Sequence, residues 1–370
     1  MEFKKKVLHL RSSGSMLGAE NVILEIAKNS HKFGFNSIIG IIKEFSDPNP
    51  QFLDHARAND LQYAVFESNK AFPLNCASEI NKFVHKNSVD VLHCHGYKED
   101  FYGIASLTGL PKISTNHLWK KSTCRLKIYR LMDIMFLYFF DMVVGVSREL
   151  VQEMHKFGLN NTAEVSNGID ISRFYKRSKN LDLLKKFGIS ESEIVLGMIS
   201  SLTPEKNHKI VIECLSKKNL PNIRLLIVGD GPFERYLKVE VKNKNLENII
   251  IFAGRQENIS QILSVIDIFL IPSLAEGLPM AMLEAMACEK AVIAAKVGEI
   301  VNVIGHGING LSIAPNNVLE LGSCIETLVY DQSLITRYGK EARKTIKERF
   351  SSMQMTEKYC EIYKSVLGNL

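Results

Sequence analysis

The stretch that decides the fold runs from Ile266 to Lys296 and reads IDIFLIPSLAEGLPMAMLEAMACEKAVIAAK. It opens with a continuous apolar run, Ile268 to Ile271, which indicates a buried strand of a parallel sheet. A polar loop follows, and Pro279 stands where a helix can begin, because its fixed φ and missing N–H cost nothing at a first helical position. We expect that helix to run to about Glu289, and a second buried strand, Ala291 to Ala295, to complete a βαβ unit.

The loop of this unit predicts a site for a ligand that carries phosphate. Ligands of open α/β sheets bind at the carboxyl ends of strands, and the N-terminus of a helix attracts anions. Glu276 precedes the helix and Glu284 lies within it, with seven residues between them. A carboxylate beside a phosphate is unfavourable unless it binds hydroxyl groups. The two glutamates therefore suggest a ligand that carries both phosphate and hydroxyl groups, such as a nucleotide sugar. Alternatively, Glu284 is a solvated helix residue and Glu276 a loop charge.

The composition is that of a globular chain with room for two domains. The 370 residues are 46% hydrophobic and 23% charged. A formal net charge of +6 is no nucleic-acid signature by itself, but it suits phosphate-bearing ligands or an anionic membrane face. Seven cysteines without a C-x-x-C pair indicate a reducing, cytoplasmic setting. The run Val7 to Leu10 is too short for a signal peptide, and Ile134 to Val146 is too short to span a bilayer.

Strand and helix patterns alternate in the amino-terminal half, which predicts a doubly wound parallel sheet. A small-residue loop, Ser12 to Gly18, joins the first strand to a helical pattern and offers backbone amides to an anion. His93 and His95 share one face of a strand, but two histidines without a nearby third ligand make zinc improbable. The expected strands are Val7 to Leu10, Ser37 to Ile42, Val89 to His93, Lys112 to Thr115 and Met142 to Val146.

The carboxyl-terminal half repeats this alternation after a polar, basic stretch, and we place the domain boundary near Phe174. Its expected strands include Ile194 to Ser200 and Ile223 to Val228. The second of these ends in G-D-G-P-F-E-R, where a dinucleotide fingerprint would need a third glycine. That position holds Glu234, so a dinucleotide site is weakly supported.

The segment S-L-A-E-G-L-P-M-A-M-L-E-A-M-A resembles the signature of the retaining glycosyltransferases of family four. This signature is the element E-x7-E within E-G-x-P-x-x-x-x-E-A-M-A. The resemblance implies an α/β chain of the GT-B fold, in which two Rossmann-like, doubly wound domains face a cleft. It places Glu276 at the donor sugar near the reacting carbon and Glu284 at the ribose hydroxyls. Gly277, Leu278 and Pro279 would form the donor-binding loop between them.

Further motifs carry the resemblance into the first half of the chain. Leu17 to Glu20 is similar to the family's G-G-x-E turn, with the first glycine replaced, and Gly18 would still let the backbone approach a ligand. A tight turn without a ligand is the alternative. Thr115, Asn116 and His117 match a T-x-H segment, which implies that His117 lies against the donor sugar.

A third set of motifs concerns the donor diphosphate. The family's G-R-L-x-x-x-K is similar to the residues from Ser200 to Lys206, which implies that Lys206 clamps the diphosphate. Ser201 stands at the arginine position and supplies no charge, so diphosphate binding is weak or another cation contributes. Phe252 to Arg255 fits the family's F-x-G-R turn, which places Gly254 and Arg255 at the nucleotide base.

The resemblance also implies a function for each domain. Residues 1–173 would bind the acceptor, residues 174–350 would bind the nucleotide-sugar donor, and a final helix over 351–370 would pack back on the first domain. The chain contains no Asp-x-Asp, so we expect no metal and no other cofactor. The expected activity is transfer of a sugar to a glycan or lipid-linked acceptor in cell-surface polysaccharide synthesis. A nucleotide-sugar epimerase on the same fold stays open, and so does a non-catalytic nucleotide-sugar-binding subunit, because Leu17 and Ser201 depart from the pattern.

The segment from His117 to Phe140 is first basic and then apolar. Such a helix can lie on an anionic membrane, which would place the protein at the inner face of the membrane. The alternative is a core helix with a solvated basic face.

Overall fold

The computed structural model describes residues 4–12, 18–44, 51–68, 73–117, 124–218 and 220–368. The chain divides into two compact units: the first unit is residues 1–168 with 352–370, and the second unit is residues 169–351. The break lies five residues before the position expected from the sequence. Ile169 and Phe174 are buried in the core of the second unit, and the Ile169 N–H donates to the Phe350 carbonyl at 2.8 Å. These contacts assign the segment 169–173 to the second unit.

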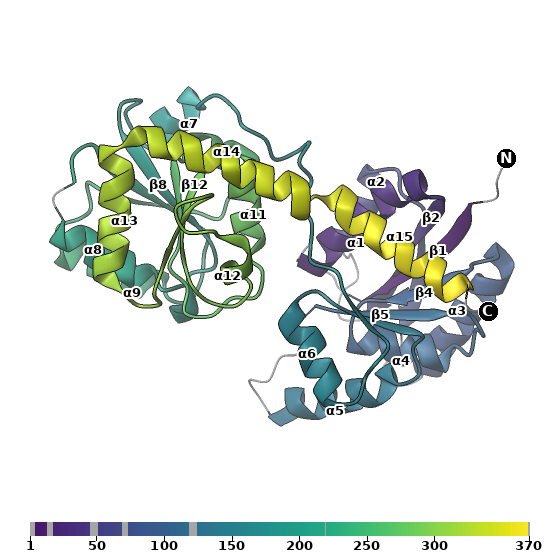
Figure 1. The fold of residues 1–370 in the computed structure, drawn as a ribbon. Coiled ribbons are helices and arrows are strands. Elements are labelled where there is room, and N and C mark those ends of the chain that lie inside the picture. The colour runs from purple at the N-terminus through teal and green to yellow at the C-terminus, as the bar shows by residue number, and fades with distance from the viewer. Residues whose placement is uncertain are drawn as a thin grey trace. The chain divides into compact units, whose positions relative to one another are not determined.

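The first unit is built on a parallel sheet whose described strands follow the order β3-β2-β1-β4-β5-β6-β7 (Figure 1). In the centre of the sheet, Leu8 of β1 pairs with Ile38 of β2 on one side and Leu92 of β4 on the other. The strands are β1 (Lys5–Arg11), β2 (Phe35–Glu44), β3 (Tyr63–Ser68), β4 (Val91–Cys94), β5 (Lys112–Asn116), β6 (Met142–Gly145) and β7 (Thr162–Glu164).

Helices connect and cover these strands. The last helix of the chain, α15 (Ser352–Gly368), packs against α1 (Gly18–Asn29), as the yellow and purple ribbons of Figure 1 show. Tyr359 and Tyr363 of α15 are fully buried in the same cluster as Val7 and Val22, so this helix is part of the core of the first unit. The other helices are α2 (Gln51–Ala58), α3 (Pro73–Asn87), α4 (Tyr97–Ala105), α5 (Cys124–Leu137) and α6 (Arg148–Lys156), with the 3-10 turn η1 (Ser30–Phe33).

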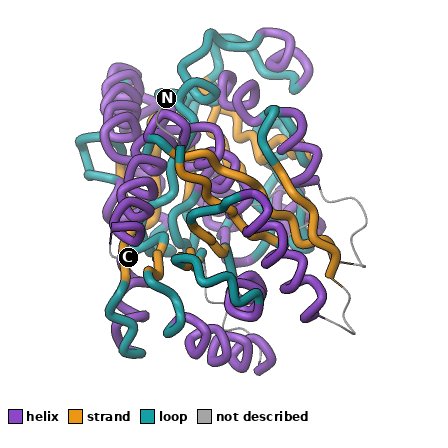
Figure 2. The backbone as a smooth tube through the Cα atoms, turned by 90° about the vertical axis from the view of Figure 1, so that its right-hand side faces the viewer, coloured by secondary structure: helices purple, strands orange, loops and turns teal. Residues whose placement is uncertain are grey.

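The second unit has its own parallel sheet, whose described strands follow the order β10-β9-β8-β11-β12-β13. Figure 2 shows strands in orange and helices in purple, and in each unit the two alternate along the chain. The strands are β8 (Ile194–Ile199), β9 (Ile223–Val228), β10 (Ile250–Gly254), β11 (Ile268–Ile271), β12 (Ala291–Ala295) and β13 (Leu311–Ile313). The helices are α7 (Leu181–Lys186), α8 (His208–Lys217), α9 (Glu234–Asn243), α10 (Ile259–Val265), α11 (Met280–Ala287), α12 (Ile300–Val303), α13 (Val318–Tyr330) and α14 (Gln332–Arg349), with the 3-10 turn η2 (Pro204–Lys206).

The stretch that decides the fold forms the βαβ unit β11–α11–β12, and Ile268 pairs in parallel with Ala291. Its helix is shorter than the sequence pattern predicts. Pro279 is extended, at φ −71° and ψ 116°, and caps the helix from outside instead of occupying the first helical position. At the other end Glu289 has a left-handed φ of 57°, which ends the helix after Ala287. The loop before α11 is therefore one residue longer than expected.

Candidate functional site

A cavity of about 220 Å³ lies in the second unit, where β8 and β11 end. Its wall includes the first turn of α11, from Pro279 to Ala281, so the start of that helix faces the cavity. The first N–H groups of a helix have no intrahelical partner and attract anions. The polar side chains of the wall belong to Ser200, Ser201, Lys206, Ser273 and Glu276.

The two loops that carry these side chains are tied together by hydrogen bonds to backbone carbonyl groups. The side-chain amide of Asn207 donates to the Pro272 carbonyl at 3.2 Å, and the Leu274 N–H donates to the Glu205 carbonyl at 2.8 Å. A third segment supports the loop from behind, because a Cβ at Gly298 would lie 1.9 Å from the Glu276 carbonyl oxygen. Only glycine permits this approach, and Gly298 also has a left-handed φ of 48°. The position of Glu276 is therefore fixed by the fold.

The G-D-G-P turn after β9 has a supporting role. A Cβ at Gly229 would lie 2.0 Å from the Ser200 carbonyl oxygen, and one at Gly231 would lie 2.5 Å from the Leu202 carbonyl oxygen. The Leu202 N–H donates to the Asp230 carbonyl at 2.8 Å. These glycines let the turn pack against the backbone of residues 200–202, which line or adjoin the cavity.

Lys206 and Glu276 meet inside the cavity. The Lys206 ammonium donates to both carboxylate oxygens of Glu276, at 2.6 and 2.8 Å, and the Ser273 hydroxyl donates to one of them at 2.7 Å. The side chains are 26% and 10% exposed, respectively, so the pair is mostly shielded from water. An ion pair in such a place is stronger than one at the surface. The structure thus joins two residues that are 70 positions apart and that the sequence assigns to one site.

Ser200 is held by a residue that the sequence analysis did not single out. The Ser200 hydroxyl lies 3.1 Å from Nε2 of His208, the first residue of α8. Burial, helped by the charge of Lys206, lowers the pKa of His208 to about 4, so this imidazole is neutral at pH 7. Ser201, at the position where the family has arginine, is exposed and lines the same cavity. Lys206 is the single cation among the described residues of this wall.

Glu284 lies one turn further along α11 and is half-buried. Burial raises the pKa of Glu284 to about 7, and the nearby charge of Arg173 opposes that shift. The cavity wall as described ends at Ala281, so Glu284 borders the site without lining it.

The other residues predicted for the donor site in this unit are not among the residues that line the cavity. Gly277 is exposed, and its carbonyl accepts from the Glu299 N–H at 3.3 Å, while Leu278 packs on the core of the unit. Gly254 ends β10, and its carbonyl accepts from the Gly229 N–H at 2.9 Å. Arg255 follows it with an exposed side chain.

Two predicted residues, Gly18 and His117, belong to the first unit. Gly18 is exposed at the start of α1. Two residues later, Glu20 is fully buried and forms an ion pair of 2.7 Å with Arg11 at the end of β1. His117 directly follows β5 and stacks on His95, with ring centroids 5.8 Å apart, and burial lowers the pKa of His117 to about 3.

The first unit corrects one expectation about histidines. His93 and His95 do share a face, with ring centroids 4.0 Å apart, but a third histidine is close to them. His9 of β1 lies opposite His93, and its Nδ1 is 3.1 Å from Nε2 of His95. The three rings each offer a nitrogen within 4.8 Å of the others. The premise that no third ligand is near was wrong, because the parallel register of β1 and β4 cannot be read from either strand alone.

Protein groups already occupy most of these nitrogens. Nδ1 of His93 contacts the Tyr363 hydroxyl at 2.8 Å, and Nε2 contacts the Thr115 hydroxyl at 2.8 Å. Nε2 of His9 contacts the Ser37 hydroxyl at 3.0 Å. The cluster is a buried hydrogen-bond network that joins α15 to the sheet, and a metal ion would have to break it.

A model described as "Glycosyltransferase Family 4" matches residues 17–173, and one described as "Glycosyl transferases group 1" matches residues 179–345. The chain belongs to the family-four glycosyltransferases. The two matches cover one structural unit each, apart from the segment around residues 169–178 and the chain ends.

The names of two similar proteins state different acceptors, L-malate in one and a diphosphoundecaprenol-linked sugar in the other. N-acetyl-alpha-D-glucosaminyl L-malate synthase of Bacillus anthracis is 34% identical over 61% of this chain and 60% of its own length. The UDP-Gal:alpha-D-GlcNAc-diphosphoundecaprenol alpha-1,3-galactosyltransferase of Escherichia coli is 23% identical over 99% of this chain and 98% of its own length. The chain thus spans less than two thirds of the first relative and nearly all of the second.

Solved structures confirm the GT-B fold of this glycosyltransferase. Alr3699/HepE of Anabaena in complex with UDP is similar with a TM-score of 0.85 at 23% identity, over 97% of this chain and all of that one. A glycosyltransferase from Rickettsia africae gives a TM-score of 0.83 at 23% identity, over 99% and 100% of the two chains. Within the described residues, no helix has the length and apolar character that crossing a membrane requires.

Proposed function

We propose that this family-four glycosyltransferase moves a sugar from a nucleotide-sugar donor to a glycan or lipid-linked acceptor, with retention of configuration and without a metal ion. The observation that carries the proposal is the meeting of Lys206 and Glu276 in one cavity beside the start of α11. A cation and helix N–H groups suit a diphosphate, and a carboxylate suits sugar hydroxyls. The cavity thus offers groups for both parts of a nucleotide sugar, the diphosphate and the sugar hydroxyls.

Each group has a role in the proposed reaction. The Lys206 ammonium and the N–H groups at the start of α11 stabilise the negative charge that develops on the departing diphosphate. The Glu276 carboxylate binds hydroxyls of the sugar and stabilises positive charge at the anomeric carbon. Glu284 contacts the ribose, and a role of His117 at the donor sugar stays a prediction of the family resemblance. The leaving phosphate accepts the proton of the acceptor hydroxyl on the same face, which gives retention.

The side chains of the cavity support the proposal that no metal ion takes part. Glu276 is the single carboxylate among the described lining residues, and it is already paired with Lys206. A magnesium ion at a diphosphate is usually held by one or two carboxylates. Here a protein cation fills the role of neutralising the diphosphate.

The names of similar proteins support the choice of substrates. UDP is bound in the Anabaena structure, and another structure of that protein contains UDP-glucose. The names of the Escherichia coli relative and of a Campylobacter jejuni relative each contain a diphosphoundecaprenol acceptor. These names favour a lipid-linked acceptor. We further propose, as the family resemblance implies, that the transfer serves cell-surface polysaccharide synthesis on the cytoplasmic side of the membrane.

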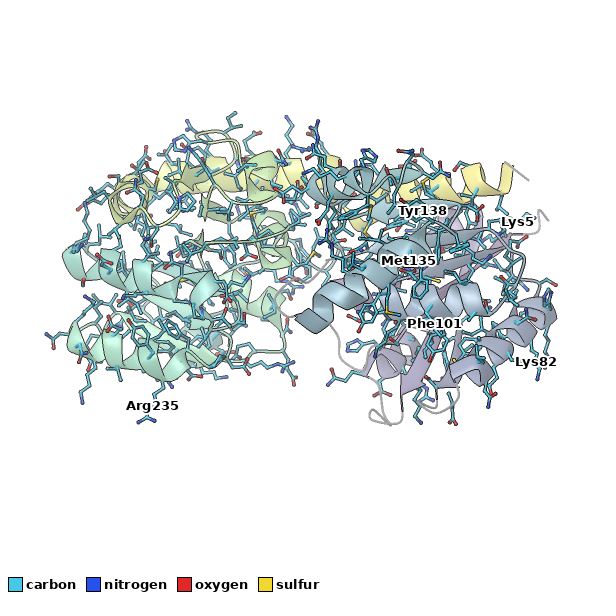
Figure 3. The ribbon with its side chains drawn as sticks, turned by 90° about the horizontal axis from the view of Figure 1, so that it is seen from below. Lys5, Lys82, Phe101, Met135, Tyr138 and Arg235 are labelled. Carbon is cyan, nitrogen blue, oxygen red and sulfur yellow. The ribbon has the colours of Figure 1, made fainter. Side chains whose placement is uncertain are left out.

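Helix α5 supports contact with that membrane. Its apolar end has one buried face, with Ile134 and Leu137, and one exposed face. Figure 3 labels Met135 of the exposed face, which is 66% exposed, and Tyr138, which directly follows the helix and is 58% exposed. Phe139, the next residue, is 68% exposed. The basic residues expected to accompany it are Lys120, Lys121, Arg125, Lys127 and Arg130. The first four lie outside the described residues or have side chains outside them, and Arg130 is part-buried and pairs with Glu153. We expect the protein to float with vesicles that contain an anionic phospholipid at low salt, and a Met135→Ser/Phe139→Ser variant to stay behind. Equal flotation of both proteins, or of neither, would remove the membrane from the proposal.

The activity is tested in two steps. A thermal-shift screen against UDP-, GDP- and ADP-sugars identifies the donor, and transfer is then measured with a short lipid diphosphate-sugar acceptor. Lys206→Ala and Glu276→Ala should each reduce transfer by at least about 100-fold with unchanged circular dichroism. EDTA should leave the rate unchanged, and NMR of the product should show the anomeric configuration of the donor.

Other outcomes would select a rival function. Normal turnover in both variants would refute the site. An altered free nucleotide sugar without any acceptor would indicate an epimerase. Binding of a nucleotide sugar without transfer or hydrolysis would indicate a non-catalytic subunit, which the serine at position 201 favours.

A further inference from the structure

Glu276 occupies the place that a diphosphate would need. It lies within 2.6–2.8 Å of the Lys206 ammonium through both of its oxygens, which is the contact that an anionic ligand would make. The Ser273 hydroxyl holds one of the same oxygens at 2.7 Å. The carboxylate is thus bound from two sides within the cavity.

The backbone gives this pair little freedom to separate. Lys206 ends the turn η2, which the Asn207 and Glu205 hydrogen bonds fasten to the loop of Glu276. Gly298 supports that loop from the opposite side. Side-chain torsions, and not loop movements, must therefore part the ammonium from the carboxylate.

The described wall holds no second cation, so the Glu276 carboxylate and an entering diphosphate would compete for Lys206. Ser201 stands where an arginine would add a charge, and Ser200 offers a hydroxyl held by His208. A diphosphate entering this cavity must take Lys206 from Glu276, and the freed carboxylate then needs new donors. The hydroxyl groups of a donor sugar can supply them, whereas a nucleoside diphosphate has only its ribose hydroxyls, which the proposed function assigns to Glu284.

We propose that Glu276 is an internal competitor of the diphosphate, which makes the cavity bind a nucleotide sugar in preference to the nucleoside diphosphate left after transfer. The inference rests on the proposed function, because it takes the cavity to be the donor site. When the sugar has left, the carboxylate returns to Lys206 and helps to expel the product. Glu276 thus discriminates between substrate and product in addition to orienting the sugar.

The test is the affinity for UDP, measured by calorimetry, with GDP and ADP in parallel. Glu276→Gln keeps the size of the side chain and the acceptor for Ser273, but removes the charge that competes for Lys206. We expect UDP to bind about tenfold more tightly to this variant, a gain typical of releasing a shielded charge from its partner. Sugar transfer should fall at the same time.

Two controls separate this effect from a general change of charge. Glu326→Gln removes a carboxylate of the same unit that pairs with Lys218 at 2.7 Å away from the described wall, and UDP affinity should not change. In a Lys206→Met background, Glu276→Gln should no longer tighten UDP binding, because the cation for which the two anions compete is gone. A gain that persists without Lys206 would overturn the inference.

The remaining outcomes are also decisive. If the wild-type protein binds UDP and Glu276→Gln binds it equally or more weakly, the inference is wrong and the donor site stands. If only Glu276→Gln binds a nucleotide, the competition is stronger than expected. If neither protein binds any of the three nucleotides, the proposed function fails and the inference fails with it.

Discussion

In the second unit, polar side chains surround a cavity of about 220 Å³ at the ends of β8 and β11, whereas in the first unit polar side chains fill the ends of β1 and β4. Lys206 and Glu276 line an open space and are partly exposed. His9, His93 and His95 are fully buried and bond to one another and to hydroxyl groups. Both sets lie where α/β sheets usually bind ligands.

The difference teaches that the position of a polar residue does not by itself decide its role. A buried polar atom that is bonded within the protein stabilises the fold and is not free for a ligand. Among the ring nitrogens of His9, His93 and His95, one buried atom lacks such a partner, Nδ1 of His95. A polar group in a cavity wall can still bind a ligand, even when it already has a protein partner, as Glu276 has in Lys206. We therefore expect substitutions in the first unit's histidine network to change stability, and substitutions at the cavity to change binding.

The largest expected effect concerns His93, whose ring joins Tyr363 of α15 to Thr115 of β5. His93→Ala leaves two buried hydroxyl groups without this partner. We expect it to lower the free energy of unfolding by about 2–4 kcal/mol, as judged by urea denaturation, with the affinity for UDP unchanged.

A second histidine of the first unit serves as the control. His155 bonds the Thr162 hydroxyl at 2.7 Å on the exposed surface, so His155→Ala should cost less than about 0.5 kcal/mol. Equal effects of the two substitutions, or a loss of UDP binding in folded His93→Ala, would break the contrast between the units.

The sequence predicts the centre of each sheet and misses its edges. The strands β9, β11 and β12 begin and end where the apolar runs do. The strands that were not expected are β3, β7, β10 and β13, and each lies at an edge of its sheet. An edge strand has one neighbour and is short or partly exposed: β7 has three residues, none of them fully buried. The strands β7 and β13 are too short for the apolar run that marks a central strand. The strand β10 does have such a run, but the sequence analysis assigned Phe252 to Arg255 to a turn of the family.

The site was predicted to a similar degree. Two motifs of the family, the signature and G-R-L-x-x-x-K, assigned Lys206, Glu276 and Pro279 to one ligand, and all three residues line one cavity. Supporting residues such as His208 and Gly298 were not expected, since their roles depend on packing between distant segments. His9 was missed for the same reason, because its contact with His95 arises from the pairing of β1 with β4. A His-rich pair of strands is the signal that could have found it.

The next effect in size concerns Ser201, which faces the cavity without a charge. Ser201→Arg adds a second cation, so a diphosphate no longer depends on Lys206 alone. We expect the affinity for UDP to rise about fivefold, as calorimetry would measure. Ser216→Arg adds the same charge on the exposed side of α8 and should change nothing. Unchanged affinity in Ser201→Arg would mean that the cavity does not hold the diphosphate.

The smallest expected effect is a difference in how the stability of each unit depends on pH. Burial raises the pKa of Glu284 in the second unit to about 7 from an ordinary 4.5. As the pH rises from 4.5 to 7, the unfolded chain releases this proton and the folded unit keeps it, so the second unit loses stability. In the first unit, burial lowers the pKa of His9 to about 3. The unfolded chain binds a proton there as the pH falls below 6.5, so the first unit loses stability in the opposite direction.

Hydrogen exchange, corrected for the intrinsic effect of pH, can follow α11 and β1 in one experiment. Glu284 is half-buried, and we therefore expect its contribution between pH 5 and 8 to be only about 1 kcal/mol. Glu284→Gln should remove the loss of protection of α11 at high pH and leave the profile of β1 unchanged, while Glu257→Gln, an exposed loop residue, should alter neither. If the protection of α11 and β1 in the wild-type protein changes with pH in the same direction, Glu284 and His9 do not set the pH dependence of the two units.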